Sequence, residues 1–547
     1  MKKPILIFFL ITSLNLIAQF GSQDSGGKLI LEQACYDVKY YDINLAIDTA
    51  KHTIGGYVTM NIEAVTDFDK IIVDLDTVYR VKSVLLLNSK ETNLEFIHSN
   101  GKIAIDFSDK IEKGNLIKIK IVYSGSPRIA KKPPWDDGFV WKKNLFGKTW
   151  ASVTCQGGGA DIWLPCKDHP SDEPDSVSIN LIVPNDVVCI SNGKLISSNN
   201  YDSSNKIWKW FVSTPINNYN ITFYLGPYKK IEYNYISVTG ETIPFTVWAL
   251  PENYDRALMH SSQFLDHMKI MEELIGPYPF RADKYAVVES PYLGMEHQTA
   301  IAYGFGWKNH KDFAFDWLHH HEFSHEWWGN LVTNKDWSDF WIHEGLGTYM
   351  QPLYLERMFG KEKYSAYLKS LKHFSNKLPV APRGEKTAGE TYSLDVYYKG
   401  AWILHTLRFY LGDDLFFKVL RRWAYPTKEL EKVTDGRQCR LATTDEMIQI
   451  AEDNSGKELN WFFEVYLRTA KLPVLNVHYK TNKVEMKWTT ENDINFELPV
   501  PVKIGGKIIK VEMHNGSGEI PLPQNAEFII DPEEWILMDQ INYTGLK

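Results

Sequence analysis

The sequence predicts a multidomain α+β protein in which a largely helical domain lies between two β domains. Short segments that alternate apolar and polar residues fill the first and last parts of the chain, whereas segments with an apolar period of about 3.6 residues fill the middle. At 547 residues the chain is too long for one hydrophobic core, so about three or four domains are expected.

The N-terminal β domain is expected to span residues 24–232. Alternation is clear at residues 57–62 and 117–121, and the turn-forming pair Asn-Gly occurs at 100–101 and 192–193. Several short alternating strands separated by turns are typical of an antiparallel β domain.

A helical domain is expected at residues 233–468, because the character of the sequence changes near Pro251. Amphipathic periodicity there predicts a series of helices. The expected helices are 253–275, 313–331, 345–359, 361–374, 396–411, 414–423 and 444–454.

The last segment, residues 469–547, is expected to form a small β-sandwich. Alternation returns at residues 483–488 and 507–511. No large helical domain is expected after it.

The N-terminus is typical of a signal peptide, expected at residues 1–21. Lys2 and Lys3 precede an apolar run at 4–18, and polar residues follow at 19–22. This order predicts export to the periplasm or the cell exterior. A retained anchor is the alternative, but the run is short for a membrane span, and no transmembrane span is expected in the mature chain.

Composition excludes some functions. The net charge is -8 and no basic stripe is present, so nucleic acid is not an expected partner. The cysteine spacings fit no Cys-based metal site. We expect zero to two disulfides and no cysteine catalysis from Cys35, Cys155, Cys166, Cys189 and Cys439.

A metal-binding pattern lies in the predicted helix at 313–331. His321 and His325 are four residues apart, so both imidazoles lie on one helix face and can bind one Zn²⁺. Glu322 can face a metal-bound water without binding the metal. Glu344, at the start of the next helix, can supply a third ligand. Two His and one Glu leave the fourth position open, as in catalytic zinc sites.

The stretches at 321–333 (HEFSHEWWGNLVT) and 337–345 (WSDFWIHEG) resemble the M1 family of zinc aminopeptidases, the gluzincins. The resemblance implies an N-terminal β domain, a thermolysin-like catalytic domain and one Zn²⁺ per chain. The family usually has Asn before the glutamate ligand, where this chain has His343. Glu326 and Asp339 are candidates to orient the metal-binding imidazoles.

Substrate-binding residues follow from the same resemblance. Gly294, Met295, Glu296 and His297 occupy the place of the family's Gly-x-Met-Glu-Asn motif, which implies that Glu296 binds the free α-amine of a peptide. Two departures, Leu293 for Gly and His297 for Asn, leave side-chain preference open.

Two shorter matches complete the expected site. Residues 154–156, Thr-Cys-Gln, resemble a segment of the family's N-terminal domain and imply that Gln156 is a second contact to the amine. Residues 397–401, Tyr-Tyr-Lys-Gly-Ala, resemble the family's Tyr-Glu-Lys-Gly-Ala, so Tyr397 takes the place of the catalytic tyrosine. The adjacent Tyr398 is the alternative by one residue.

The resemblance implies a zinc-dependent aminopeptidase that hydrolyses N-terminal residues from peptides by a metal-activated water, with Glu322 as the base. The alternatives are a zinc endopeptidase with the same fold, leukotriene-type epoxide hydrolysis, and an inactive peptide-binding homologue. The sequence leaves the preferred N-terminal residue and the oligomeric state open.

Overall fold

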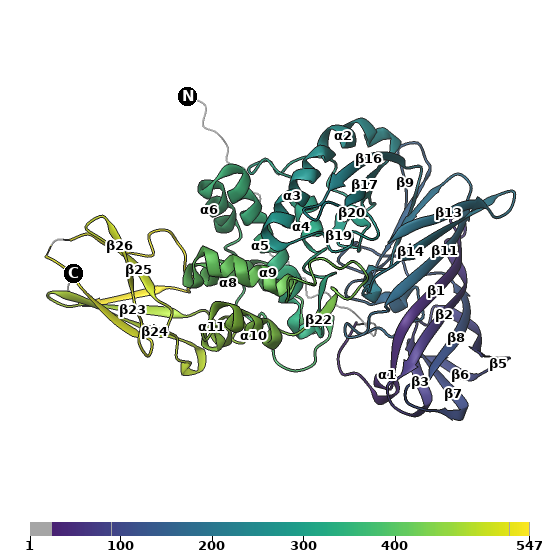
Figure 1. Ribbon diagram of the computed structural model, residues 1–547, viewed down its shortest axis with the longest axis horizontal. Coiled ribbons are helices and arrows are strands. Elements are labelled where there is room, and N and C mark those ends of the chain that lie inside the picture. Colours follow the sequence, from purple (N-terminus) through teal and green to yellow (C-terminus); the bar gives the residue numbers. More distant parts are fainter. Residues whose placement is uncertain (1–23, 89, 525, 546–547) are drawn as a thin grey trace.

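The computed structural model describes residues 24–88, 90–524 and 526–545, so the predicted signal peptide lies outside the described residues. The predicted order of domains is confirmed. Figure 1 shows a β-rich part at one end, a helical part in the middle and a second β-rich part at the other end.

The largest sheet of the N-terminal domain has the strand order β13-β14-β11-β1-β2-β8-β4-β5. Its neighbours pair antiparallel, except that β1 (Tyr36–Asp48) pairs parallel with β11 (Ser176–Pro184). The sheet is therefore mixed rather than wholly antiparallel, since alternation shows which face a residue takes but not the direction of the neighbouring strand. The other strands are β2 (Thr53–Ala64), β4 (Tyr79–Leu87), β5 (Glu91–Asn93), β8 (Leu116–Gly125), β13 (Lys194–Asn200) and β14 (Asn205–Val212).

Two smaller sheets complete this domain. One has the order β3-β7-β6 and the other β12-β15-β10-β9. Strand β10 ends two residues before Gln156, so the second sheet carries that side chain to the domain boundary. The elements are α1 (Leu31–Ala34), β3 (Phe68–Asp74), β6 (Glu95–Ser99), β7 (Lys102–Ile111), β9 (Gly138–Lys143), β10 (Thr149–Thr154), η1 (Ala160–Ile162), β12 (Val188–Ser191), η2 (Asn218–Asn220) and β15 (Phe223–Gly226).

A five-stranded sheet with the order β16-β17-β18-β20-β19 begins the catalytic domain. Because β16 pairs with β17 along its whole length, the boundary expected after residue 232 falls inside β16. The short strand β19 lies at the sheet edge and pairs antiparallel with β20. The strands are β16 (Lys229–Ile236), β17 (Thr242–Ala249), β18 (Tyr285–Glu289), β19 (Gly294–Met295) and β20 (Ile301–Tyr303).

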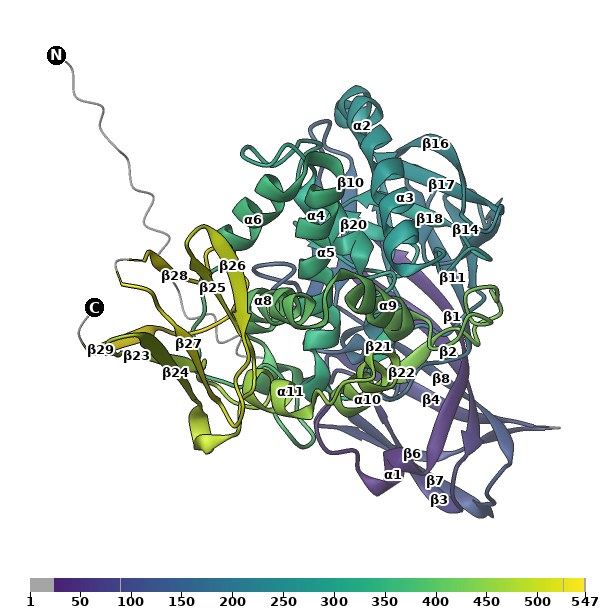
Figure 2. The same cartoon turned by 60° about the vertical axis from the view of Figure 1, so that its left-hand side comes forward.

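The helices of the middle part lie at one side of this sheet and extend toward the C-terminal domain (Figures 1 and 2). They are α2 (Tyr254–His260), α3 (Phe264–Ile275), α4 (Trp317–Ser324), α5 (Trp341–Phe359), α6 (Lys361–Ser370), α7 (Ala388–Thr391), α8 (Leu394–Leu411), α9 (Asp413–Ala424), α10 (Thr444–Ser455) and α11 (Asn460–Tyr466). Between them lie η3 (Pro251–Asn253), η4 (Ser261–Gln263), η5 (Trp337–Asp339) and the strand pair β21 (Val332–Asn334) and β22 (Arg440–Ala442).

The helix predicted over residues 313–331 is wrong in extent, because α4 covers only Trp317–Ser324. Asp316 caps its start, and its Oδ1 accepts the His319 N–H at 3.0 Å. After His325 the chain turns and passes through Gly329 at φ 145°, and then it enters β21. The two histidines therefore lie in the last turn and at the C-cap of a short helix.

Helices α5 and α8 cross at two glycines. A Cβ built on Gly400 would lie 2.8 Å from the Cα of Gly345, so the two backbones are in direct contact. Glu344 precedes one of these glycines and Tyr397 lies one turn before the other. The close crossing therefore brings the glutamate and the tyrosine to the same place.

The C-terminal domain contains two sheets, with the orders β27-β24-β23-β29 and β26-β25-β28. Buried residues from both sheets belong to one hydrophobic cluster, as expected for a β-sandwich, and this cluster continues into the helical domain. The elements are β23 (Val474–Tyr479), β24 (Lys483–Thr489), η6 (Glu491–Asp493), β25 (Val500–Ile504), β26 (Lys507–Val511), β27 (Ser517–Pro521), β28 (Phe528–Ile530) and β29 (Ile541–Gly545).

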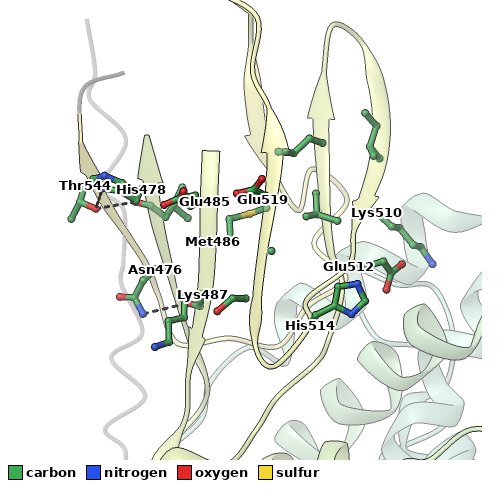
Figure 3. A pocket seen from close by; sticks show the side chains of 16 residues that line it. Asn476, His478, Glu485, Met486, Lys487, Lys510, Glu512, His514, Glu519 and Thr544 are labelled. Atoms are coloured by element: carbon green, nitrogen blue, oxygen red, sulfur yellow. Dashed lines mark hydrogen bonds between the residues drawn. The ribbon is translucent and has the colours of Figure 1, made fainter. Parts of the chain in front are cut away.

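A groove of about 800 Å³ lies on this C-terminal domain. Figure 3 shows polar side chains such as Lys487, Glu512 and Glu519 along it. Its lining residues all come from positions 476–544, so the groove is separate from the predicted metal ligands. Among the residues that the structure describes, no helix is both long and apolar enough to cross a bilayer.

The helix crossing gives the first testable prediction. Alanine normally stabilises a helix relative to glycine by about 0.5–1 kcal/mol. At Gly400, however, the added methyl would push α8 away from α5, so we expect Gly400→Ala to lower the melting temperature. Gly345→Ala should be milder, because its Cβ would lie 3.1 Å from Val396 O and 3.2 Å from Gly400 Cα. Thermal unfolding of both variants measures this, and a stabilised Gly400→Ala would contradict it.

Candidate metal centre and active site

Three predicted ligands meet between α4 and α5. The Nε2 atoms of His321 and His325 lie 3.4 Å apart, and Glu344 Oε2 lies 3.4 Å from the first and 3.5 Å from the second. Ligand atoms at about 2.0–2.1 Å from a tetrahedral Zn²⁺ are separated by about 3.3–3.4 Å. The triangle of donor atoms therefore has the size that zinc requires.

The chemistry of the donors also fits zinc. Burial lowers the pKa of His321 to about 4, so its imidazole is neutral and able to bind a metal near neutral pH. Glu344 is 2% exposed, and its Oε2 has no hydrogen-bond partner among the described residues. A buried carboxylate oxygen without a hydrogen bond costs free energy unless a cation satisfies it. These residues can hold one Zn²⁺.

The orientation of His325 is fixed by the backbone. Its Nδ1–H donates to the carbonyl oxygen of Trp328 at 2.8 Å, which leaves Nε2 free to face the metal. Glu326 and Asp339, which were expected to orient the metal-binding imidazoles, make other hydrogen bonds. Glu326 accepts the Thr299 N–H, and Asp339 accepts the N–H and the hydroxyl of Thr444. The carbonyl is available because α4 ends early, a feature that the residue types do not reveal.

The predicted base, Glu322, lies beside the ligands and against β19. One ligand atom each from Glu322, Glu296 and His325 lies within 4.8 Å of the others. A Cβ on Gly294 would overlap Glu322 Oε1, so only glycine leaves room for this carboxylate. Burial, followed by repulsion from Glu296 and Glu344, raises the pKa of Glu322 well above its usual range. Gly294 thus has a steric role in the site.

Glu296 is held by two donors from the N-terminal domain. Gln156 Nε2 donates to Glu296 Oε1 at 2.5 Å, and the Tyr219 hydroxyl donates to the same oxygen at 2.8 Å. Asn330 Nδ2 also donates to the Glu296 carbonyl oxygen at 3.0 Å. The structure therefore brings Gln156 and Glu296 together across the domain boundary and adds Tyr219, which no sequence motif indicated.

Tyr397 lies over the first metal ligand. Its ring is 6.0 Å from the His321 ring, and its hydroxyl is 3.3 Å from that of Tyr392. Burial, followed by repulsion from Glu344, raises the pKa of Tyr397 well above its usual range. The phenol therefore stays protonated and can donate a hydrogen bond.

Two residues of the expected substrate motif lie outside this cluster. Met295, the last residue of β19, is buried in the hydrophobic cluster formed mainly by the N-terminal domain. His297 is fully buried and its Nδ1 bonds the Tyr224 hydroxyl at 2.6 Å; burial lowers its pKa to about 3. The extended chain points neighbouring side chains in opposite directions, so only Glu296 of this trio faces the metal ligands.

Comparison with known families identifies the class of this fold and site. The model of the peptidase M1 N-terminal domain matches residues 38–219, and the model of the peptidase family M1 domain matches residues 307–466. Together with the metal triad, these matches define a zinc metallopeptidase. The chain belongs to peptidase family M1.

Solved structures share the fold. The M1 zinc metallopeptidase of Deinococcus radiodurans superposes with a TM-score of 0.65 at 20% identity, over 83% of this chain and 98% of that chain. Among curated relatives, leukotriene A-4 hydrolase of Xenopus laevis is 24% identical over 349 residues, which is 60% of this chain and 53% of that protein. Aminopeptidase M1 of Arabidopsis thaliana is 22% identical over 488 residues, which is 82% of this chain and 52% of that protein. The chain spans about half the length of these curated relatives.

Zinc and pH should act together on stability. Burial raises the pKa of Glu344 from 4.5 to about 8, so in the metal-free protein the folded state binds a proton that the unfolded state releases above its own pKa. The stability of the metal-free protein should therefore fall as the pH rises through this window. Zinc needs the ionised carboxylate, so the stabilisation by zinc should grow with pH.

Melting temperatures with and without zinc, at about pH 5.5 and about pH 8, measure this effect; each kcal/mol corresponds to about 2–4 °C. Glu344→Gln is the matched control, because it removes the titrating group and a ligand without changing the size of the side chain. Equal stabilisation by zinc at both pH values would contradict the assignment of Glu344.

Proposed function

We propose that this peptidase is a zinc-dependent aminopeptidase, which removes single residues from the N-termini of peptides. The observation that carries the proposal is the position of Glu296. Its carboxylate is 3% exposed, lies beside the metal ligands and is fixed by Gln156 and Tyr219. A carboxylate held there can bind the α-ammonium group of a peptide and leave the first peptide bond near the metal.

The charge of the site supports this assignment. Glu296, Glu322 and Glu344 are all buried, and burial together with repulsion from Glu296 raises the pKa values of the last two. Three ionised carboxylates carry three negative charges. One Zn²⁺ and one substrate ammonium carry three positive charges. Buried charges are tolerated when they are paired, so the occupied site would be close to neutral.

The position of β19 at the edge of the catalytic sheet favours binding of an extended peptide. Strand β19 pairs with β20 on one side only and lies at the end of the sheet. A peptide can add a strand to such an edge through backbone hydrogen bonds. Since Glu296 follows β19 directly, a peptide bound in this way would end at the carboxylate.

The chain's own residues can perform the remaining chemistry. Bound zinc supplies a Lewis acid for the scissile carbonyl and lowers the pKa of a water molecule. Glu322 is placed to accept the proton of the attacking water and to deliver it to the leaving amine. Tyr397 is placed to donate a hydrogen bond to the developing oxyanion, a type of contact worth about 2.7–4 kcal/mol of barrier.

Two solved relatives are consistent with a site for free N-termini. A mutant of the Deinococcus radiodurans M1 zinc metallopeptidase was solved with Tyr-Ser-Ala, described as its substrate, at 20% identity, over 83% of this chain and 98% of that chain. A two-domain M1 zinc metallopeptidase mutant was solved with L-tryptophan, at 21% identity over the same shares. Export of this chain remains a prediction from residues 1–21.

The amine anchor is tested with matched substrates. We expect the wild type to cleave aminoacyl-coumarin substrates and to leave their N-acetylated forms intact, because acetylation removes the positive charge that Glu296 binds. Glu296→Gln should lower kcat/KM by about 10²-fold or more, since it leaves the ammonium unpaired. Tyr219→Phe, which removes one donor and keeps the charge, should have a smaller effect in the same direction.

Equal cleavage of free and N-acetylated peptides by the wild type would contradict the proposal and favour an endopeptidase. Zinc bound at one ion per chain without turnover on any aminoacyl or internal peptide substrate would favour an inactive homologue.

The role of Glu322 is tested separately. Glu322→Gln should keep its zinc, because Glu322 is not among the three proposed ligands, and should lower kcat by about 10²–10⁴-fold. Elemental analysis measures the zinc and aminoacyl-coumarin assays measure kcat. A variant with full zinc and normal kcat would show that another group is the base.

A further inference from the structure

The first described residues of the chain cross the boundary between the two domains beside the proposed active site. Ser25 N–H donates to the Gly157 carbonyl of the N-terminal domain at 3.0 Å. On the other side, Ala388 N–H donates to the Ser25 carbonyl at 3.0 Å. Gly27 N–H donates to the Lys386 carbonyl at 3.0 Å. We call residues 24–27 the N-terminal strap.

Side chains fix the strap further. Asp24 Oδ1 accepts the Gly389 N–H at 2.8 Å, and Trp337 Nε1–H donates to Ser25 Oγ at 3.3 Å. The strap is therefore attached to the catalytic domain by α7 and by η5, in addition to its bond to the N-terminal domain.

Gly26 packs directly on a buried tryptophan. It has φ 82°, a conformation that favours glycine, and a Cβ at this position would overlap Trp337 Cδ1. Trp337 is 3% exposed, so its ring cannot move away without disturbing its neighbours. The close packing thus depends on the absence of a side chain at residue 26.

Two short paths lead from the strap to Glu296. The Trp337 ring lies 6.4 Å from the Tyr219 ring, and Tyr219 donates to Glu296 Oε1. Gly157, which bonds the strap, directly follows Gln156, the other donor to the same oxygen. The strap therefore holds the supports of both hydrogen bonds that orient the carboxylate.

A third path leads to the proposed oxyanion donor. Ala388, which bonds Ser25, accepts the Tyr392 N–H at 2.9 Å, and the Tyr392 hydroxyl lies 3.3 Å from that of Tyr397. Trp337, Ala388, Tyr392 and Tyr397 belong to one small hydrophobic cluster. This path passes through Ala388 and Tyr392 before it reaches Tyr397, whereas Gly157 adjoins Gln156 and Trp337 packs against Tyr219, so the strap should affect the amine contacts more than the oxyanion donor.

We propose that the N-terminal strap, residues 24–27, is a positioning segment that holds Gln156 and Tyr219 against Glu296 and so sets the affinity for the free amine of the substrate. This inference rests on the aminopeptidase function proposed above. Domains of one chain are expected to move relative to each other unless their interface is large and hydrophobic, and a segment bonded to both domains restricts such motion. Binding groups must be held within about 0.5 Å of their productive position. A strap bonded to both domains meets this requirement.

Gly26→Ala tests the proposal, and Gly114→Ala is its matched control. Gly114 has a similar φ of 84°, but a Cβ there would meet no atom within 4 Å, so the control carries the same backbone strain without a strap contact. We expect Gly26→Ala to raise KM for an aminoacyl-coumarin substrate about tenfold and to change kcat by less than about threefold. The reason is that the contact to the amine is equally strong in the bound substrate and in the transition state, so its loss weakens binding and leaves the chemical step unchanged. Zinc content should match that of Gly114→Ala, and the rise in KM should be present at temperatures well below the melting transition of Gly26→Ala.

An unchanged KM, or a fall in kcat alone, would overturn the proposal. A parallel loss of melting temperature and activity relative to the control would show a purely structural role and would also overturn it. If Gly26→Ala does not fold, Ser25→Ala replaces it, because it removes the hydroxyl that Trp337 bonds without straining the backbone; it should raise KM in the same way, and an unchanged KM would overturn the proposal. Lack of aminopeptidase activity in the wild type would instead reject the proposed function.

Discussion

Repulsion among three buried carboxylates is the constraint on which this site depends. Glu296, Glu322 and Glu344 come from different parts of the chain and are all buried. Burial, together with repulsion from Glu296, raises the pKa values of Glu322 and Glu344 and so favours their protonation unless cations are bound. The imidazoles of His321 and His325 complete a set of donors for one such cation, so metal binding at this site should displace protons from the carboxylates.

Glycine residues at the closest contacts allow the fold to bring these charged groups together. Gly345 and Gly400 let α5 and α8 touch, which places Glu344 near Tyr397, and Gly294 leaves space for Glu322 beside β19. The backbone also contributes, because the Trp328 carbonyl oxygen accepts the Nδ1–H of His325 and so orients its ring. The N-terminal domain contributes Gln156 and Tyr219, so the proposed amine site is complete only where the two domains meet.

Sequence patterns predicted the domain order, most helices and the residues that meet at the metal site, because alternation, periodicity and the four-residue histidine spacing are local features. They did not predict the end of α4 at Ser324, since the residues that follow keep an apolar pattern although the chain turns. They also missed Tyr219, which lies in an Asn-rich 3₁₀ turn, and residues 24–27, whose contacts are more than 100 residues away in the chain. Such long-range contacts leave no periodic signal.

The central claim, that one zinc ion is held by two imidazoles and Glu344, is tested most directly by zinc-edge anomalous diffraction from crystals of the purified protein. The account predicts a single strong peak between His321 Nε2, His325 Nε2 and Glu344 Oε2, at about 2.0–2.2 Å from each atom. A crystal grown with zinc that shows no peak there, or a peak with Glu344 turned away from it, would contradict the account.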